Sequence, residues 1–219
     1  MPAYTPIPTY SRHPKPATGE DGFFAQTLSS SITIPSVHTF RNSTLNSLPS
    51  QPPPWPSPID PPQLIPVGSD SDLEEAGANA KANANANANA ADLLMLLQLA
   101  SPGVCGHPSM AHGGVLATVI DEAMSLGVTL YAPEAAEDYQ VPQEQGQAQG
   151  GGRIRSKMFT AQLDVRYKKP VSVPGEIEVR VKVLAKQGKK LWVRAQVVQK
   201  GEIMVDAVAF WLLTLKSNL

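Results

Sequence analysis

The chain has 219 residues, a formal net charge of −1 at pH 7 and a sequence pI near 6.4. This length allows one domain with long appendages or two small domains. The near-neutral charge gives no electrostatic footprint for nucleic acid or an anionic membrane, so we expect a small-molecule or protein partner. No apolar run approaches the roughly 20 residues of a membrane helix, and the proline-rich start lacks the apolar core of a secretory signal. We therefore expect a cytoplasmic protein without a membrane span.

The first 91 residues are expected to precede the folded domain as an arm and a linker. Residues 1–47 should form an arm that docks onto another surface, with a short helix near Glu20 to Leu28, because Phe23, Phe24 and Leu28 share one helical face. Residues 48–91 contain a proline-rich part, an acidic part and an alternating Ala-Asn run, so we expect a solvated linker and a low-complexity insertion.

The folded domain is expected at residues 92–216, and its most distinct element is a helix. From Gly113 to Tyr131 the apolar residues recur at intervals of three and four, which predicts one long and largely buried helix. Pro133 ends it, and residues 131–155 are rich in glutamine, glycine and acidic residues, which indicates a flexible loop. The single cysteine, Cys105, cannot form an internal disulfide, so we interpret it as a packed or loop thiol.

Strands surround this helix in the sequence. Apolar and polar residues alternate in four segments after it, and one short apolar run precedes it. The expected strands are Leu93 to Leu99, Met158 to Tyr167, Ile177 to Val183, Leu191 to Val197 and Ile203 to Leu215. Consecutive hairpins would join the last four. The resulting fold class is α+β, with a curved antiparallel sheet wrapped around one central helix so that both apolar surfaces are buried.

The start of the helix carries the residues that suggest chemistry. Gly113 and Gly114 let a ligand approach the backbone, and a helix N-terminus offers N–H groups without intrahelical partners. Asp121, two turns further on, supplies a carboxylate that could act as a base or a nucleophile in acyl transfer. The alternative is a glycine-containing helix start beside an aspartate that makes an interface hydrogen bond. No serine-hydrolase elbow, metalloprotease motif or dinucleotide fingerprint is present, so no metal or redox cofactor is expected.

The segment His112-Gly-Gly, an acidic residue nine positions after the histidine, and a downstream Tyr167-Lys-Lys-Pro resemble the hot-dog acyl-CoA thioesterases. The chain is similar to the phenylacetate-pathway and mitochondrial thioesterase-superfamily groups, and to fungal members in particular. The resemblance covers roughly Leu93 to Lys216. It implies that Gly113 donates its N–H to the thioester oxygen, that Asp121 is the catalytic carboxylate, and that Thr160 helps to position water. It also implies a homodimer or homotetramer in which Asp121 and Thr160 meet across the interface.

Other residues are assigned to substrate binding or to structure. His112, Gly114 and His107 are expected beside the acyl thioester, although each histidine could serve only the turn or loop that holds it. Glu122 is expected in a structural role or in the dimer contact. The lysines expected to bind the phosphates of coenzyme A are Lys168, Lys169 and Lys190, with Arg166 and Lys189 near them. Alternatively, these basic residues lie at solvated strand edges, where their charges deter aggregation and bind no phosphate. A hot-dog dehydratase and a non-catalytic acyl-binding or scaffold protein remain alternatives. The last residues, 216–219, resemble a peroxisomal signal, so peroxisomal or mitochondrial delivery are alternative locations.

Overall fold

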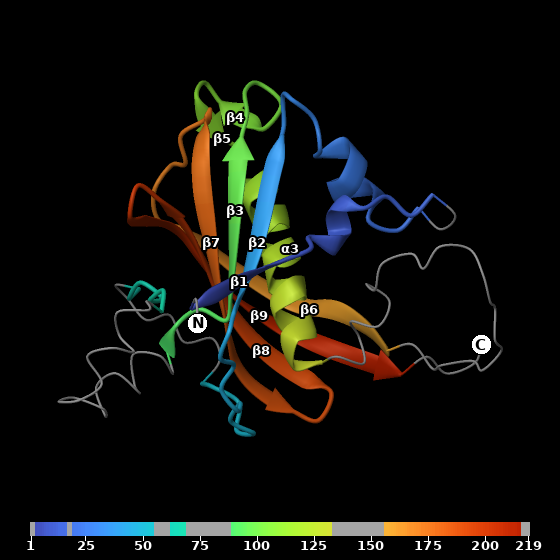
Figure 1. The fold of residues 1–219 in the computed structure, drawn as a ribbon. Helices are drawn as coiled ribbons and strands as arrows, with labels where there is room; N and C mark the ends of the chain where they lie inside the picture. The colour runs from blue at the N-terminus through green and yellow to red at the C-terminus, as the bar shows by residue number, and fades with distance from the viewer. Residues whose placement is uncertain (1–2, 17–18, 55–61, 69–88, 133–155, 216–219) are drawn as a thin grey trace.

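A curved antiparallel sheet wraps around one long helix in the computed structural model (Figure 1). The structure describes residues 3–16, 19–54, 62–68, 89–132 and 156–215. Within these residues the sheet has seven strands in the order β1-β2-β3-β7-β8-β9-β6, and β4 and β5 form a separate hairpin. The strands are β1 (Tyr4–Ile7), β2 (Ser36–Asn42), β3 (Leu93–Leu99), β4 (Cys105–His107), β5 (Met110–Ala111), β6 (Ser156–Tyr167), β7 (Gly175–Gln187), β8 (Lys190–Gln199) and β9 (Glu202–Leu215). The expected α+β architecture is confirmed.

The central helix, α3, runs from Gly113 to Tyr131, as the sequence predicts. Its buried residues recur on the face toward the sheet and include Leu116, Val119, Ile120 and Met124. By length and composition alone α3 could cross a membrane, since it has 19 residues and a mean hydropathy of 1.3 over an 18-residue window. Its position inside the curved sheet is that of a core helix, because the core residues of β3, β7, β8 and β9 pack with it in one apolar cluster (Figure 1).

One glycine sets how closely the helix approaches the sheet. A Cβ atom on Gly127 would lie 2.8 Å from Cγ1 of Val181 on β7. Both residues are buried, so there is no free volume into which the valine could move. The missing side chain therefore allows α3 to pack against the middle of the sheet.

The strand order differs from a simple run of hairpins. β7, β8 and β9 are joined as two consecutive hairpins, as expected. β6 pairs with β9 and not with β7, so the chain crosses from one edge of this group of strands to the other between Tyr167 and Gly175. The expected hairpin between the first two of these strands is therefore wrong. β6 lies at the end of the sheet, beside α3 (Figure 1).

The N-terminal arm extends the sheet, which the sequence did not predict. β2 pairs with β3, and β1 pairs with β2. The short helix expected at Glu20 to Leu28 is a five-residue π-helix, η2 (Phe23–Thr27), preceded by a 3-10 turn, η1 (Tyr10–Arg12). Arg12 joins these pieces, because its guanidinium donates to the carbonyl groups of Phe24 and Ile34 and lies 5.0 Å from the centre of the Phe24 ring.

Part of the expected linker is also docked. Ile65 is only 5% exposed and packs with Ala91 and Leu94 on the outer face of the sheet. Its N–H donates to Oε1 of Gln196 at 2.7 Å, and its carbonyl accepts from Arg180 at 2.8 Å. The prediction of a solvated linker is thus wrong for Ile65, while most of its neighbours in residues 62–68 are exposed. Most of the Ala-Asn run, the loop after Ala132 and the last four residues lie outside the described residues.

Candidate active site

Asp121 on α3 and Thr160 on β6 face each other. The Thr160 hydroxyl donates to Oδ1 of Asp121 at 2.7 Å. The pairing of β6 with β9 shifts register between Thr160 and Gln162, so a β-bulge lies next to this contact. Burial raises the pKa of Asp121 above its usual value, and the Thr160 hydrogen bond opposes this rise. Asp121 is thus a partly buried carboxylate with one hydroxyl donor, as a general base or nucleophile requires.

The start of α3 presents a free amide. His112 is the N-cap residue, and its Nδ1 accepts a hydrogen bond of 2.9 Å from the Gly114 N–H. The neighbouring Gly113 N–H donates to no group in the described part of the chain. It lies where the helix dipole is positive, so it is suited to an oxygen that gains negative charge. His112 therefore serves the turn, which was one of the two expected roles.

Gly113 and Asp121 do not meet within one chain. Eight residues separate them on the same helix, which corresponds to about 12 Å along the axis and about 80° around it. A single thioester group is too small to contact both. Within the isolated chain, the glycine turn and the carboxylate therefore lie apart. The resemblance also implied that Asp121 and Thr160 meet across a dimer interface, whereas here they meet within one chain.

Glu122 faces the N-terminal arm. Burial raises its pKa to about 7; the negative charges of Asp21 and Asp121 add to this, while the Ser11 hydroxyl and the positive charge of Arg12 oppose it. Adjacent residues on a helix point about 100° apart, which explains why Asp121 reaches β6 and Glu122 reaches η1. The expected structural role of Glu122 agrees with these contacts.

His107 and Cys105 belong to the β4–β5 hairpin, which leads into α3. His107 is exposed, and Cys105 is half-buried with its Sγ 3.5 Å from the Ser101 hydroxyl. A Cβ atom on Gly106 would lie 2.9 Å from Cα of His112. The hairpin thus supports the N-cap of α3, and no contact of His107 with Gly113 or Asp121 is seen.

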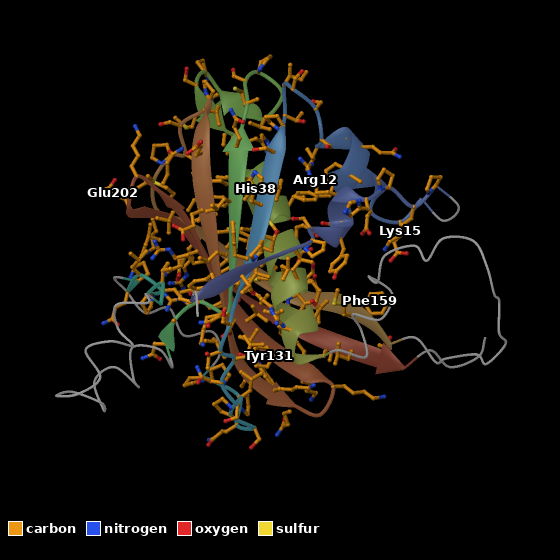
Figure 2. All side chains as sticks on the ribbon, in the orientation of Figure 1. Arg12, Lys15, His38, Tyr131, Phe159 and Glu202 are labelled. Atoms are coloured by element: carbon orange, nitrogen blue, oxygen red, sulfur yellow. The ribbon has the colours of Figure 1, made fainter. Side chains whose placement is uncertain are left out.

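The three lysines expected to bind phosphate lie at two ends of the sheet. Lys169 forms an ion pair of 2.7 Å with Glu202, and Lys168 precedes it at the end of β6. Lys190 begins β8 and aligns with Leu212, which in turn aligns with Phe159 near the other end of β6. Figure 2 shows Phe159 and Glu202 on opposite sides of the molecule. One chain therefore does not gather these lysines into one patch.

The two main grooves of the described part of the chain lie away from the candidate residues. Two grooves, of about 480 and 390 Å³, lie over β2, β3 and β7 and between β2 and the N-terminal arm, and neither is lined by Asp121 or Gly113. Among the described residues, no three His, Cys, Asp or Glu side chains gather as metal ligands. The candidate residues lie along α3 and β6.

Sequence reasoning overlooked Tyr167 as a site residue, although it named the motif that contains it. Tyr167 ends β6 and its hydroxyl donates to the carbonyl of Gly113 at 2.8 Å. Thr160 and Tyr167 thus place β6 against two different turns of α3. The spacing of these residues in the sequence carries no signal for this contact, because it depends on how the strand lies on the helix.

A family model and several solved structures are similar to this chain. Residues 109–205 match the family model of the thioesterase superfamily, which confirms the resemblance at that level. A solved protein from Bacillus halodurans with CoA is 20% identical, with 55% of this chain and 66% of that chain covered and a TM-score of 0.41. A hypothetical thioesterase from Streptococcus pneumoniae with coenzyme A is 12% identical over 57% and 80%, with a TM-score of 0.42. A mutant phenylacetic acid degradation protein from Thermus thermophilus is 13% identical over 55% and 83%, with a TM-score of 0.42. None of the curated proteins compared with this chain matches it.

Proposed function

We propose that this protein, whose residues 109–205 belong to the thioesterase superfamily, hydrolyses an acyl thioester of coenzyme A or of a carrier to the free acid and the thiol. The observation that carries the proposal is the pair of Asp121 and Thr160, because a partly buried carboxylate held by a hydroxyl is poised for acyl transfer. The phenylacetate-pathway and fungal affinities stay predictions.

The chemistry requires a base and a donor for the oxyanion. In one route Asp121 takes a proton from water, whose oxygen attacks the thioester carbon; the carbonyl electrons move to the oxygen. In the other, the carboxylate attacks directly and water hydrolyses the resulting anhydride. In both, collapse of the tetrahedral species breaks the C–S bond and the sulfur leaves as a thiol after protonation. The Gly113 N–H would stabilise the oxyanion in each route.

A second copy of the chain would complete the site. Because Gly113 and Asp121 lie about 12 Å apart along α3, the donor and the base would come from different chains in a dimer. β6 is the last of the described strands in the sheet order, so its outer edge is available for pairing, and Phe159 on it is 51% exposed. Two helices in opposite directions would set Asp121 and Thr160 of one protomer near the glycine turn of the other.

Such an arrangement would also bring together the separated lysines. Lys190 lies toward the Thr160 end of β6, and Lys168 and Lys169 follow the Tyr167 end. In an antiparallel dimer, the two ends of β6 come from different protomers at each site. We therefore propose that the phosphates of coenzyme A bind at the interface, between lysines of both protomers.

A thiol-release assay across acyl-CoA chain lengths tests the proposed activity. We expect the wild-type protein to release free thiol, and Asp121→Asn, which keeps the size and removes the charge, to lose about 10²- to 10⁴-fold in kcat. Glu122→Gln is the matched control on the next residue and should retain most of the activity. Binding of acyl-CoA without hydrolysis would favour the acyl-binding alternative, and hydration of an enoyl-CoA would favour the dehydratase.

A pair of substitutions at Gly113 isolates the amide donor. Gly113→Pro removes the N–H at the first helical position, where proline is tolerated, and His112 before it is already extended with φ −68° and ψ 132°. Gly113→Ala adds a Cβ atom, as the proline variant does, but keeps the N–H. We expect kcat to fall about 10²- to 10³-fold further in the proline variant than in the alanine variant. Equal rates in the two variants would exclude the Gly113 amide as the oxyanion donor.

A further inference from the structure

Tyr167 packs on the first turn of α3. Its hydroxyl donates to the Gly113 carbonyl at 2.8 Å, and its ring atoms lie 3.3 to 3.4 Å from the point where a Cβ atom on Gly113 would be. The side chain is 53% exposed, so it covers Gly113 from the solvent side without being part of the core. This contact joins the end of β6 to the candidate oxyanion donor.

The peptide group between Gly113 and Gly114 is held at both of its ends. Tyr167 binds its carbonyl oxygen, and Nδ1 of His112 binds its N–H at 2.9 Å. Two successive glycines have more backbone freedom than any other pair of residues, so these two bonds restrict a turn that is otherwise easily deformed. The Gly113 N–H belongs to the preceding peptide group, which meets the held group at the Gly113 Cα atom, so an ordered Gly113–Gly114 peptide limits the directions that this N–H can take.

We propose that Tyr167 is a positioning residue, which together with His112 clamps the Gly113–Gly114 peptide and thereby aims the Gly113 N–H. The inference rests on the proposed function. An oxyanion donor contributes because it is fixed before charge develops, so a loosened donor lowers kcat and leaves ground-state binding nearly unchanged. Tyr167 acts through the backbone of Gly113 and not on the substrate itself.

The clamp is first tested without substrate, by NMR of protein labelled with ¹⁵N-glycine. Tyr167→Phe removes only the hydroxyl and should shift the amide signals of Gly113 and Gly114. Tyr4→Phe is the matched control on the outer face of the sheet, where the Tyr4 hydroxyl donates to Ala91 and accepts from the Gly68 N–H. It should shift the Gly68 signal and leave Gly113 unchanged. Unchanged Gly113 and Gly114 signals in Tyr167→Phe would overturn the proposal.

The second arm measures kinetics on the hydrolysed substrate. For Tyr167→Phe we expect kcat to fall about ten-fold, with KM within about two-fold of the wild type and the same melting temperature. Tyr4→Phe should match the wild type in both constants. A wild-type kcat in Tyr167→Phe, or a raised KM with kcat unchanged, would show that Tyr167 does not position the donor. If the wild-type protein hydrolyses no thioester, the proposed function fails, and the glycine signals still decide whether the clamp exists.

Discussion

Asp121 and Glu122 are neighbours with opposite surroundings. Asp121 meets a hydroxyl on β6 beside a solvent-exposed edge, and Glu122 lies between α3 and the N-terminal arm near Ser11 and Arg12. Burial raises the pKa of both carboxyls. Only Asp121 has a hydroxyl partner from the strand that borders the candidate site, so the two acids should respond differently to mutation and to pH.

Removing the Thr160 hydroxyl should move the acid limb of the activity profile. The reaction needs the Asp121 carboxylate, so activity is present above the pKa of Asp121 and is lost as pH falls through it. The Thr160 hydrogen bond lowers this pKa, so Thr160→Val should shift the acid limb of kcat/KM to higher pH and reduce the rate at neutral pH roughly ten-fold. Thr160→Ser keeps the hydroxyl and should keep the wild-type limb. A pH–rate profile of the three proteins decides this.

Replacing Glu122 should stabilise the protein at alkaline pH. Its pKa is raised to about 7 in the folded state, so the folded protein binds more protons than the unfolded chain between the ordinary glutamate pKa and about 7. The contribution of Glu122 to the free energy of unfolding is complete below the ordinary glutamate pKa. It is lost as the pH rises through 7, because the buried carboxyl then becomes charged. Glu122→Gln should therefore gain on the order of 2 kcal/mol at pH 8 relative to pH 4 to 5. Urea unfolding of the wild type and of Glu122→Gln at both pH values measures this difference in the free energy of unfolding. The same change at both pH values would contradict a raised pKa of Glu122.

At the scale of elements, a glycine in the helix and a bulge in an edge strand determine how the helix packs against the sheet. Gly127 lets α3 approach Val181, and the bulge after Thr160 turns β6 at the candidate site. The arm adds two strands to the sheet, and Arg12 holds its two short helices in place (Figure 2). These contacts fix the position of α3, and α3 in turn carries Gly113 and Asp121.

Filling the space at Gly127 should be destabilising only when Val181 is present. Gly127→Ala gains about 1 kcal/mol of helix propensity, but its Cβ atom would lie 2.8 Å from the valine, and overpacking costs about 1–3 kcal/mol. In the Val181→Ala background the methyl group that causes the clash is gone, so the same substitution should become neutral or stabilising. Urea unfolding of the four proteins gives the coupling. A loss of stability that is equal in both backgrounds would place the strain elsewhere.

At the scale of the whole molecule, the candidate groups are distributed along one chain, and the proposed dimer would bring them together. The base and its hydroxyl partner lie at one turn of α3, the free amide and Tyr167 at another, and the edge strand β6 touches both. The two main grooves of the described part of the chain are not lined by these residues. The homodimer and the cytoplasmic location stay predictions.

Mixing two inactive proteins tests the shared site. We expect Asp121→Asn and Gly113→Pro to be inactive alone, and to recover about a quarter of the wild-type activity after unfolding and joint refolding in equal amounts. Statistical exchange makes about half of the dimers mixed, and each mixed dimer would have one intact site of two. A refolded mixture that stays inactive, although light scattering shows dimers, would contradict a site that is shared between two chains.

The sequence by itself determined the central helix to the residue, the strands around it and Asp121 and Gly113 as candidates, because apolar periodicity and turn chemistry are local properties. Thr160 became a candidate only through the resemblance to the thioesterases. Only the tertiary structure decided that Ser36–Asn42 and Tyr4–Ile7 join the sheet, that Ile65 is buried, and that β6 pairs with β9. It also decided that Asp121 meets Thr160 within one chain while Gly113 meets Tyr167. These contacts join residues far apart in sequence, and their free energy comes from how whole elements pack, which no local pattern encodes.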